Sequence, residues 1–236
     1  MDLAIMRLDK YLADMQVGTR SIVKEIIRKG RVEVNGVIVK KSDAQVKLND
    51  EIKVDGDLIN YLEYEYLVMN KPADYLTACE DKRYPVVMDI IHSVRKDLGP
   101  VGRLDKDTEG VLLITNDGDL NHALLSPKYH VQKTYYAEVD NDLPDNAKEI
   151  LSKPMVFSDF TAAPADNYEQ ISKRSAYLTI SEGKFHQVKR MFAKLGTNVI
   201  YLKRVKFANL DVEDLKPGQY RPLSEEEITI LKSYIK

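Results

Sequence analysis

Cysteine is almost missing from this chain of 236 residues, because Cys79 is the only one. A single thiol excludes an internal disulfide framework and a cysteine-based zinc site, and its ordinary role is that of a small apolar side chain. Long apolar runs are missing too, since no stretch approaches the roughly 18 apolar residues that a membrane helix needs. The first residues lack the basic-then-apolar order of a secretory signal. The sequence therefore predicts a cytoplasmic chain without membrane contact.

A basic excess is also missing, because the formal net charge is −2 and the isoelectric point is near 6.1. These values argue against a nucleic-acid partner, whose phosphates usually call for a basic surface. The average hides two basic segments, however. Residues 20–41 contain seven Lys or Arg against two Glu, and residues 181–206 contain seven against one. Such clusters are often plain solvated surface, so their meaning depends on the motifs in which they lie.

Residues 102–118 place a charged loop directly before an apolar strand. The segment 103–109 is charged or polar at nearly every position, whereas 111–114 is wholly apolar and predicts a buried strand. Asp105 is therefore expected on a loop that the core holds in place. A solvated turn and a weak calcium site stay open as alternatives, although the calcium site would lack its mid-loop glycine and closing glutamate.

The N-terminal residues predict a small module of two helices, a hairpin and a strand. Apolar residues recur at helical spacing over 8–15 and 22–27, and Asn35-Gly36 is a strong hairpin signal before a short strand at 51–54. Asp55-Gly56-Asp57 is expected to begin a polar linker. The predicted phosphate-backbone contacts lie on the exposed face and at the end of the second helix: Arg20, Lys24, Arg28, Lys29 and Arg31.

The rest of the chain mixes strands and helices without the regular alternation of a doubly wound sheet, which predicts an α+β fold. A final helix is expected after Ser224, which begins a capping box. Strands are expected near 64–69, 111–115, 133–139, 176–181 and 199–207, and helices near 86–94, 144–151 and 184–196.

Four segments in order resemble the motifs of pseudouridine synthases, in the branch that modifies ribosomal RNA and carries an S4 RNA-binding domain. The module at about residues 6–54 resembles that S4 domain. The segments are Asn70-Lys71-Pro72, Gly102 to Gly118, Lys133-Thr134-Tyr135 and Glu182 to Phe192. The resemblance implies an S4-like domain at 1–58 and a catalytic domain with a mixed, mainly antiparallel sheet at 59–236. It also implies a monomer that needs no cofactor or metal.

The chemistry of this family turns uridine into its carbon-linked isomer without net redox change, so it needs a nucleophile and not a cofactor. The resemblance implies that Asp105 is the nucleophile and that Lys189 keeps it charged in a dry pocket. Tyr135 would stack on the base and move a proton, and Arg103 would hold the extruded conformation, unless it forms a simple salt bridge to Asp107 or Glu109. His186 is expected to be structural. Substrate contacts are expected at Ile180, at Arg190 and at Lys71, which could instead support the active-site loop.

The segment 181–192 looks most like that of the small-subunit enzymes. The expected substrate is therefore the U516-type uridine of 16S ribosomal RNA, within a small-subunit assembly intermediate. A large-subunit 23S enzyme is the first alternative. A non-catalytic S4-type assembly factor and a nucleoside hydrolase that releases free uracil are alternatives from other classes.

Overall fold

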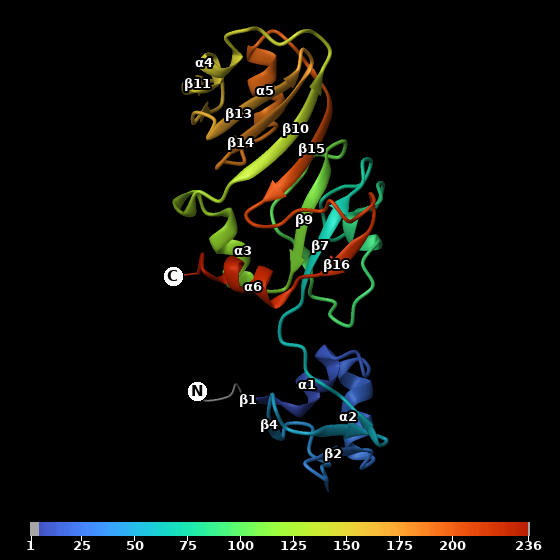
Figure 1. The fold of residues 1–236 in the computed structure, drawn as a ribbon. Helices are drawn as coiled ribbons and strands as arrows, with labels where there is room; N and C mark the ends of the chain where they lie inside the picture. The colour runs from blue at the N-terminus through green and yellow to red at the C-terminus, as the bar shows by residue number, and fades with distance from the viewer. Residues whose placement is uncertain (1–4, 236) are drawn as a thin grey trace. The chain divides into compact units, whose positions relative to one another are not determined.

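The computed structural model describes residues 5–235 and divides the chain into two compact units (Figure 1). The first unit contains the chain up to Glu65 together with the later segment His92–Leu98. The second unit contains Tyr66–Ile91 and the chain from Gly99 onward. None of the described helices is long and apolar enough to cross a bilayer.

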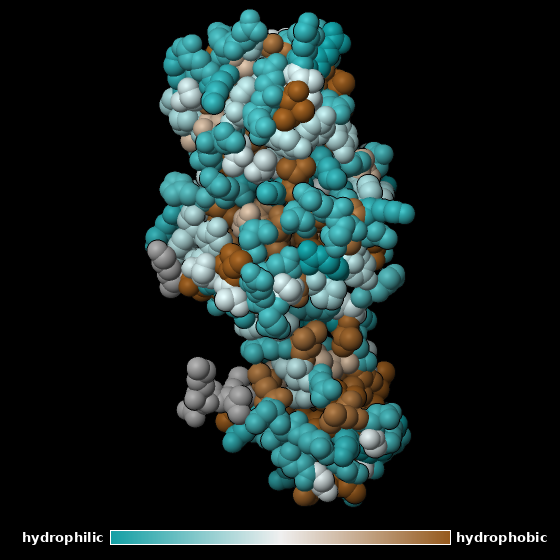
Figure 2. All heavy atoms as spheres, in the orientation of Figure 1, coloured by the Kyte–Doolittle hydropathy of each residue, from teal (hydrophilic) through white to brown (hydrophobic). Residues whose placement is uncertain are grey.

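The first unit packs two helices on small antiparallel sheets. Thr19 caps the second helix by accepting a hydrogen bond from the Ile22 amide at 3.4 Å. Leu8, Tyr11 and Ile27 are among its fully buried core residues. Several apolar side chains stay exposed, and Figure 2 shows brown patches on this unit. The elements are β1 (Ile5–Arg7), α1 (Leu8–Asp14), α2 (Arg20–Arg28), β2 (Val32–Val34), β3 (Val37–Ile38), β4 (Gln45–Lys47), β5 (Ile52–Val54) and β6 (Asp57–Leu58).

The prediction that a linker begins at Asp55 is wrong, because this segment is a second hairpin. Asp55 and Gly56 have φ values of 52° and 90°, and they turn β5 into β6, which pair antiparallel. Two consecutive residues with positive φ match the twist of a two-residue hairpin, and Asp-Gly is a preferred sequence for it. The first unit therefore holds a four-stranded sheet in the order β3-β2-β5-β6.

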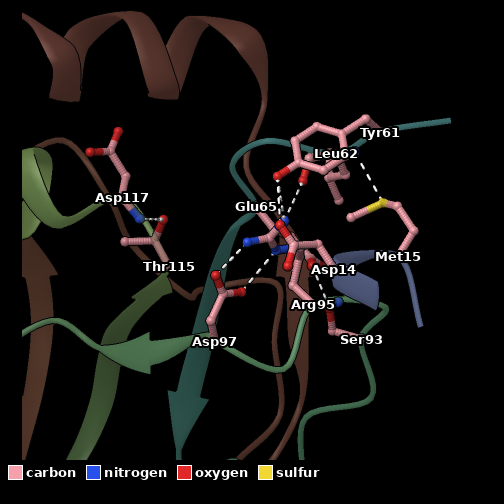
Figure 3. A network of polar contacts seen from close by, with 10 residues as sticks. All are labelled: Asp14, Met15, Tyr61, Leu62, Glu65, Ser93, Arg95, Asp97, Thr115 and Asp117. Carbon is pink, nitrogen blue, oxygen red and sulfur yellow. Dashed lines mark hydrogen bonds and ion pairs between the residues drawn. The ribbon is translucent and has the colours of Figure 1, made fainter. Parts of the chain in front are cut away.

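Arg95 ties the segment 92–98 to the end of the first unit's main chain (Figure 3). Its side chain is 7% exposed, and it donates to the Leu62 carbonyl at 3.2 Å and to the Tyr61 hydroxyl at 3.4 Å. It also forms a two-point ion pair with Asp97, which raises the pKa of the arginine. The Tyr61 hydroxyl in turn donates to Asp14 at 2.9 Å.

The helix predicted at 86–94 is wrong. Only Val87–Asp89 forms a short 3-10 turn, and the Asp89 carboxylate accepts from the Val86 amide at 2.9 Å. The apolar periodicity of this stretch is overridden by tertiary contacts, because Val86 forms a bridge with Leu76 and the Val87 amide donates to the Leu76 carbonyl at 2.9 Å.

The second unit is built on one eight-stranded sheet with the path β13-β14-β10-β15-β9-β7-β16, and β8 pairs with β9 off this path. Every pair is antiparallel except β15 with β9, so the predicted α+β class is confirmed. The strands are β7 (Tyr66–Lys71), β8 (Gly99–Pro100), β9 (Glu109–Thr115), β10 (Lys133–Val139), β11 (Met155–Val156), β12 (Thr161–Ala162), β13 (Asn167–Ser172), β14 (Ser175–Ile180), β15 (Val199–Phe207) and β16 (Tyr220–Pro222). The helices are α3 (Gly118–Leu125), α4 (Ala147–Leu151), α5 (Gln187–Lys194) and α6 (Glu225–Lys232), with a 3-10 turn at Pro127–Tyr129.

Gly110 makes the parallel junction of β9 with β15 possible. It pairs with Arg204 at φ +106°, and a Cβ atom at this position would lie 2.1 Å from the Arg204 carbonyl oxygen. Only glycine permits this approach and this φ without a clash. The junction places the start of β9, and hence the loop before it, beside β15.

Candidate active site

The loop between β8 and β9 carries Asp105, and buried side chains fix its backbone on both sides. The Thr77 hydroxyl donates to the Leu104 carbonyl at 2.8 Å and accepts from the Leu104 amide at 3.1 Å. The Thr108 amide donates to the Asp105 carbonyl at 3.1 Å, which closes a turn. The Thr77 contact could not be predicted from the sequence, since its partner lies 27 residues away.

Lys71 fixes the same loop from below the surface. Its side chain is 0% exposed, and its ammonium donates to the carbonyls of Pro72, Lys106 and Thr108 at 2.9, 3.1 and 2.9 Å. Burial lowers the pKa of Lys71 to about 8, although nearby carboxylates oppose that effect. The prediction of a direct substrate contact at Lys71 is therefore wrong, and the residue supports the active-site loop instead.

Asp105 lies against the ammonium of Lys189 from α5. Lys189 Nζ lies 3.1 Å from Asp105 Oδ2 and 2.6 Å from Asp107 Oδ1, so one cation bridges two carboxylates. Burial alone would lower the pKa of Lys189, but the two acids raise it. Burial alone would raise the pKa of Asp107, but Lys189 holds it below its ordinary value. The arrangement keeps an ammonium beside Asp105 at neutral pH.

His186 reaches the same carboxylate, with Nε2 3.5 Å from Asp105 Oδ1. It precedes α5 with φ 51°, a left-handed conformation that is uncommon for a residue with a side chain. The Gln187 side chain holds this loop by accepting from the Lys184 amide at 3.0 Å and donating to Glu182 at 3.2 Å. From the sequence, His186 is expected to be structural and outside the site. Its position three residues before Lys189 could have indicated that both side chains lie near Asp105.

The cleft in front of Asp105 is lined by Tyr135 and Ile180, which are 7% and 2% exposed. Because Lys133 pairs with Ile180 and Tyr135 is two residues further along β10, the side chains of Tyr135 and Ile180 lie on one face of the sheet.

Arg103 also lines the cleft and has no hydrogen bond or ion pair to the described residues. The alternative of a salt bridge from Arg103 is therefore wrong: Asp107 pairs with Lys189, and Glu109 accepts from the Tyr201 hydroxyl at 2.8 Å.

Comparison with known families identifies both parts of the chain. Residues 65–194 match the family model described as RNA pseudouridylate synthase, and residues 6–52 match the S4 domain. The chain belongs to the RNA pseudouridylate synthase family. Its members are isomerases that act on RNA, and this one carries an S4 domain before the synthase domain.

Relatives match this pseudouridine synthase over nearly its whole length. An uncharacterized RNA pseudouridine synthase of Aquifex aeolicus is 40% identical, with 98% of each chain covered. The ribosomal small subunit pseudouridine synthase A of Escherichia coli K12 is 37% identical over 94% of this chain and 98% of that one. A crystal structure described as pseudouridylate synthase has a TM-score of 0.68 at 36% identity, and it covers 96% of this chain and 99% of that one.

Arg190 does not line the synthase cleft, and its predicted substrate contact stays a prediction. Its guanidinium makes two hydrogen bonds to Asp159 at 3.0 and 2.5 Å, and it lies 4.7 and 4.5 Å from the ring centroids of Phe157 and Phe160. The paired Asp159 raises the pKa of Arg190. Arg190 thus anchors α5, which carries Lys189 one position earlier.

The S4 domain presents the five predicted RNA-binding residues at its surface. Arg20, Lys24 and Arg28 are exposed on α2, and Lys24 and Arg28 line a shallow depression together with Lys40. Lys29 pairs with Glu25 at 2.7 Å. Arg31 forms a two-point ion pair with Asp55. RNA contact by this surface stays a prediction.

Proposed function

We propose that this synthase converts one uridine of 16S ribosomal RNA, the U516-type site, to pseudouridine with Asp105 as the nucleophile. The observation that carries the proposal is the Asp105–Lys189 pair, 3.1 Å apart, in a cleft lined by Tyr135 and Ile180. The full-length likeness to enzymes named ribosomal small subunit pseudouridine synthase A supports the choice of the small subunit.

The residues of the cleft suit the steps of this isomerisation. The bond from the anomeric carbon of ribose to N1 of uracil must break, the base must turn, and a bond to its C5 must form. Asp105 is a charged carboxylate that displaces the base and later leaves again, and Lys189 stabilises its charge. The proton on C5 must then leave while N1 gains one, and the Tyr135 hydroxyl is the group suited to the first transfer.

The proposal also concerns the oligomeric state of the enzyme and the assembly state of its RNA substrate. We propose that the enzyme acts as a monomer, with Asp105, Lys189, Tyr135 and Ile180 lining one cleft of the chain. Extruding a stacked uridine costs a few kcal/mol, and this cost is lower before RNA tertiary structure is complete. We therefore infer that the substrate is a small-subunit assembly intermediate in the cytoplasm.

The test is pseudouridine mapping on purified small-subunit precursors, 16S transcript and 23S transcript by carbodiimide-dependent primer extension. The three proteins are wild type, Asp105→Asn and the control Asp145→Asn, which alters an exposed aspartate of the same unit. We expect one new 16S stop with wild type and the control, and none with Asp105→Asn.

Each other result would change the proposal in a defined way. A stop in 23S RNA would move the enzyme to the large subunit, and release of free uracil would favour the hydrolase. Activity retained by Asp105→Asn would refute Asp105 as nucleophile.

A further inference from the structure

A second cavity of about 430 Å³ adjoins the Asp105 cleft, and its lining is rich in cations. The two share Arg103, Tyr135, Gly183 and Lys184, so a ligand in one is directly next to a ligand in the other. The residues that only the second cavity has include Lys133 from β10 and Arg204 from β15.

Lys133 and Arg204 are buried cations with few partners. Lys133 is 7% exposed, and its ammonium donates to the Val131 carbonyl at 2.8 Å. Arg204 is 2% exposed, and its Nε donates to the Val111 carbonyl at 2.8 Å. Arg204 Nη2 is buried and has no hydrogen-bond partner. Burial and the charge of Arg204 lower the pKa of Lys133 to about 8.

Neither cation forms an ion pair within residues 5–235, although Asp166 partly opposes the lowering of the Lys133 pKa. Both cations lie over the Phe207 ring, 5.6 Å (Lys133) and 4.8 Å (Arg204) from its centroid. Glu182 is the one carboxylate in the lining, and it is already engaged by Lys184 at 3.2 Å and by the Ala163 amide at 3.0 Å. A buried charge without an opposite charge destabilises the native state, and so does a buried donor without an acceptor. An apolar pair would fill this part of the sheet at lower cost, so the two cations are matched to an anion that binds there.

We propose that Lys133 and Arg204 bind one backbone phosphate of the RNA substrate, next to the extruded uridine. This site rests on the proposed function for the identity of the RNA. A phosphodiester fits because it is the anion that every nucleotide flanking the target uridine carries. Its oxygens can also accept hydrogen bonds from the unpaired Arg204 Nη2 and from the Lys133 ammonium. Holding this phosphate fixes the strand on one side of the uridine while the base occupies the Asp105 cleft.

The test measures RNA binding with full-length Asp105→Asn protein, so that its result does not depend on catalysis. The probe is a fluorescent 16S fragment centred on the U516-type uridine, in versions with a neutral methylphosphonate at each phosphate flanking that uridine. We expect one of these substitutions to weaken binding about tenfold, which is the loss of one charge-assisted contact. Adding Lys133→Met should abolish that sensitivity and weaken binding of the unmodified probe by a similar factor.

The matched control is Lys206→Met, which removes a charge from an exposed position of β15, the strand that carries Arg204. We expect this change to weaken binding of all probes uniformly, with the methylphosphonate effect intact. Insensitivity of the parent protein to every flanking methylphosphonate would overturn the proposal without any variant having to fold. Loss of that sensitivity in Lys206→Met would overturn it too.

A final arm separates the RNA backbone from free anions. Competition by inorganic phosphate at constant ionic strength, without any effect of the methylphosphonates, would assign the cavity to a free anion and refute the RNA contact. A failure of the mapping experiment with intact, phosphate-dependent binding would instead refute the proposed reaction and leave this site standing.

Discussion

Replacing Lys71 by Met tests whether a buried ammonium holds the active-site loop. Methionine keeps the length and apolar character of the stem but removes the three hydrogen bonds to Pro72, Lys106 and Thr108. The carbonyls of Lys106 and Thr108 flank the turn that carries Asp105, so the loop loses its support from the core. A misplacement of about 1 Å at a reacting group lowers the rate roughly 100-fold, so we expect a loss in kcat of about that size.

The effect on stability depends on pH in a way that identifies the ammonium. The pKa of Lys71 is lowered from 10.5 to about 8 on folding, so the unfolded chain binds more protons than the native one between these values. Stability therefore rises with pH across that window. From pH 7 to pH 9.5 this single group adds about 2 kcal/mol to the unfolding free energy of the wild type, and the Met variant lacks that gain.

The assay is urea denaturation of wild type and Lys71→Met at pH 7, 8, 9 and 9.5, together with kcat of both proteins at pH 7. Other titrating groups, Lys133 among them, cancel in the difference between the two proteins. The reasoning would be refuted by a stability difference that stays constant with pH, or by a kcat within threefold of wild type.

Three further predictions concern other contacts, the first with a control substitution. Gly110→Ala should cost more than about 3 kcal/mol of unfolding free energy, because its Cβ would meet the Arg204 carbonyl oxygen at 2.1 Å. Gly36→Ala, with positive φ but no atom within 4 Å, should cost only about 1 kcal/mol, and equal melting temperatures would contradict the clash. Asp107→Asn should lower kcat less than about tenfold, because Lys189 still pairs with Asp105, and a larger kinetic loss would give Asp107 its own role. Arg95→Met should destabilise the first unit by about 2 kcal/mol, seen as faster hydrogen exchange at residues 59–65 with unchanged exchange in β9.

The strands and the Asp105 loop could be predicted from the sequence because their signals are local. An apolar run after a charged loop indicates a buried strand, and the strand predicted at 133–139 is found at Lys133–Val139. The pairing of Asp105 with Lys189 came from the family resemblance, since 84 residues separate them and no spacing rule connects them.

The partners of buried polar groups could not be predicted. Lys71, Thr77 and Arg95 each find acceptors that chain folding brings from about 27 to 37 residues away. Arg190 has the charge expected of an RNA contact, but its guanidinium is hydrogen-bonded to the Asp159 carboxylate and packs on the rings of Phe157 and Phe160. Net charge and helix position say nothing about such competition, which is decided by tertiary neighbours.

The segment His92–Leu98 bears on how this enzyme can be dissected. The chain passes between the two units after Glu65, after Ile91 and again after Leu98, so a single cut cannot release the first unit intact. A truncated synthase that begins after residue 65 would keep the ion pair of Arg95 with Asp97 but lose the Leu62 and Tyr61 acceptors of this guanidinium. Domain exchange with other RNA-binding modules would need to transplant both pieces together, so the N-terminal module is a discontinuous part of this enzyme and not a detachable prefix.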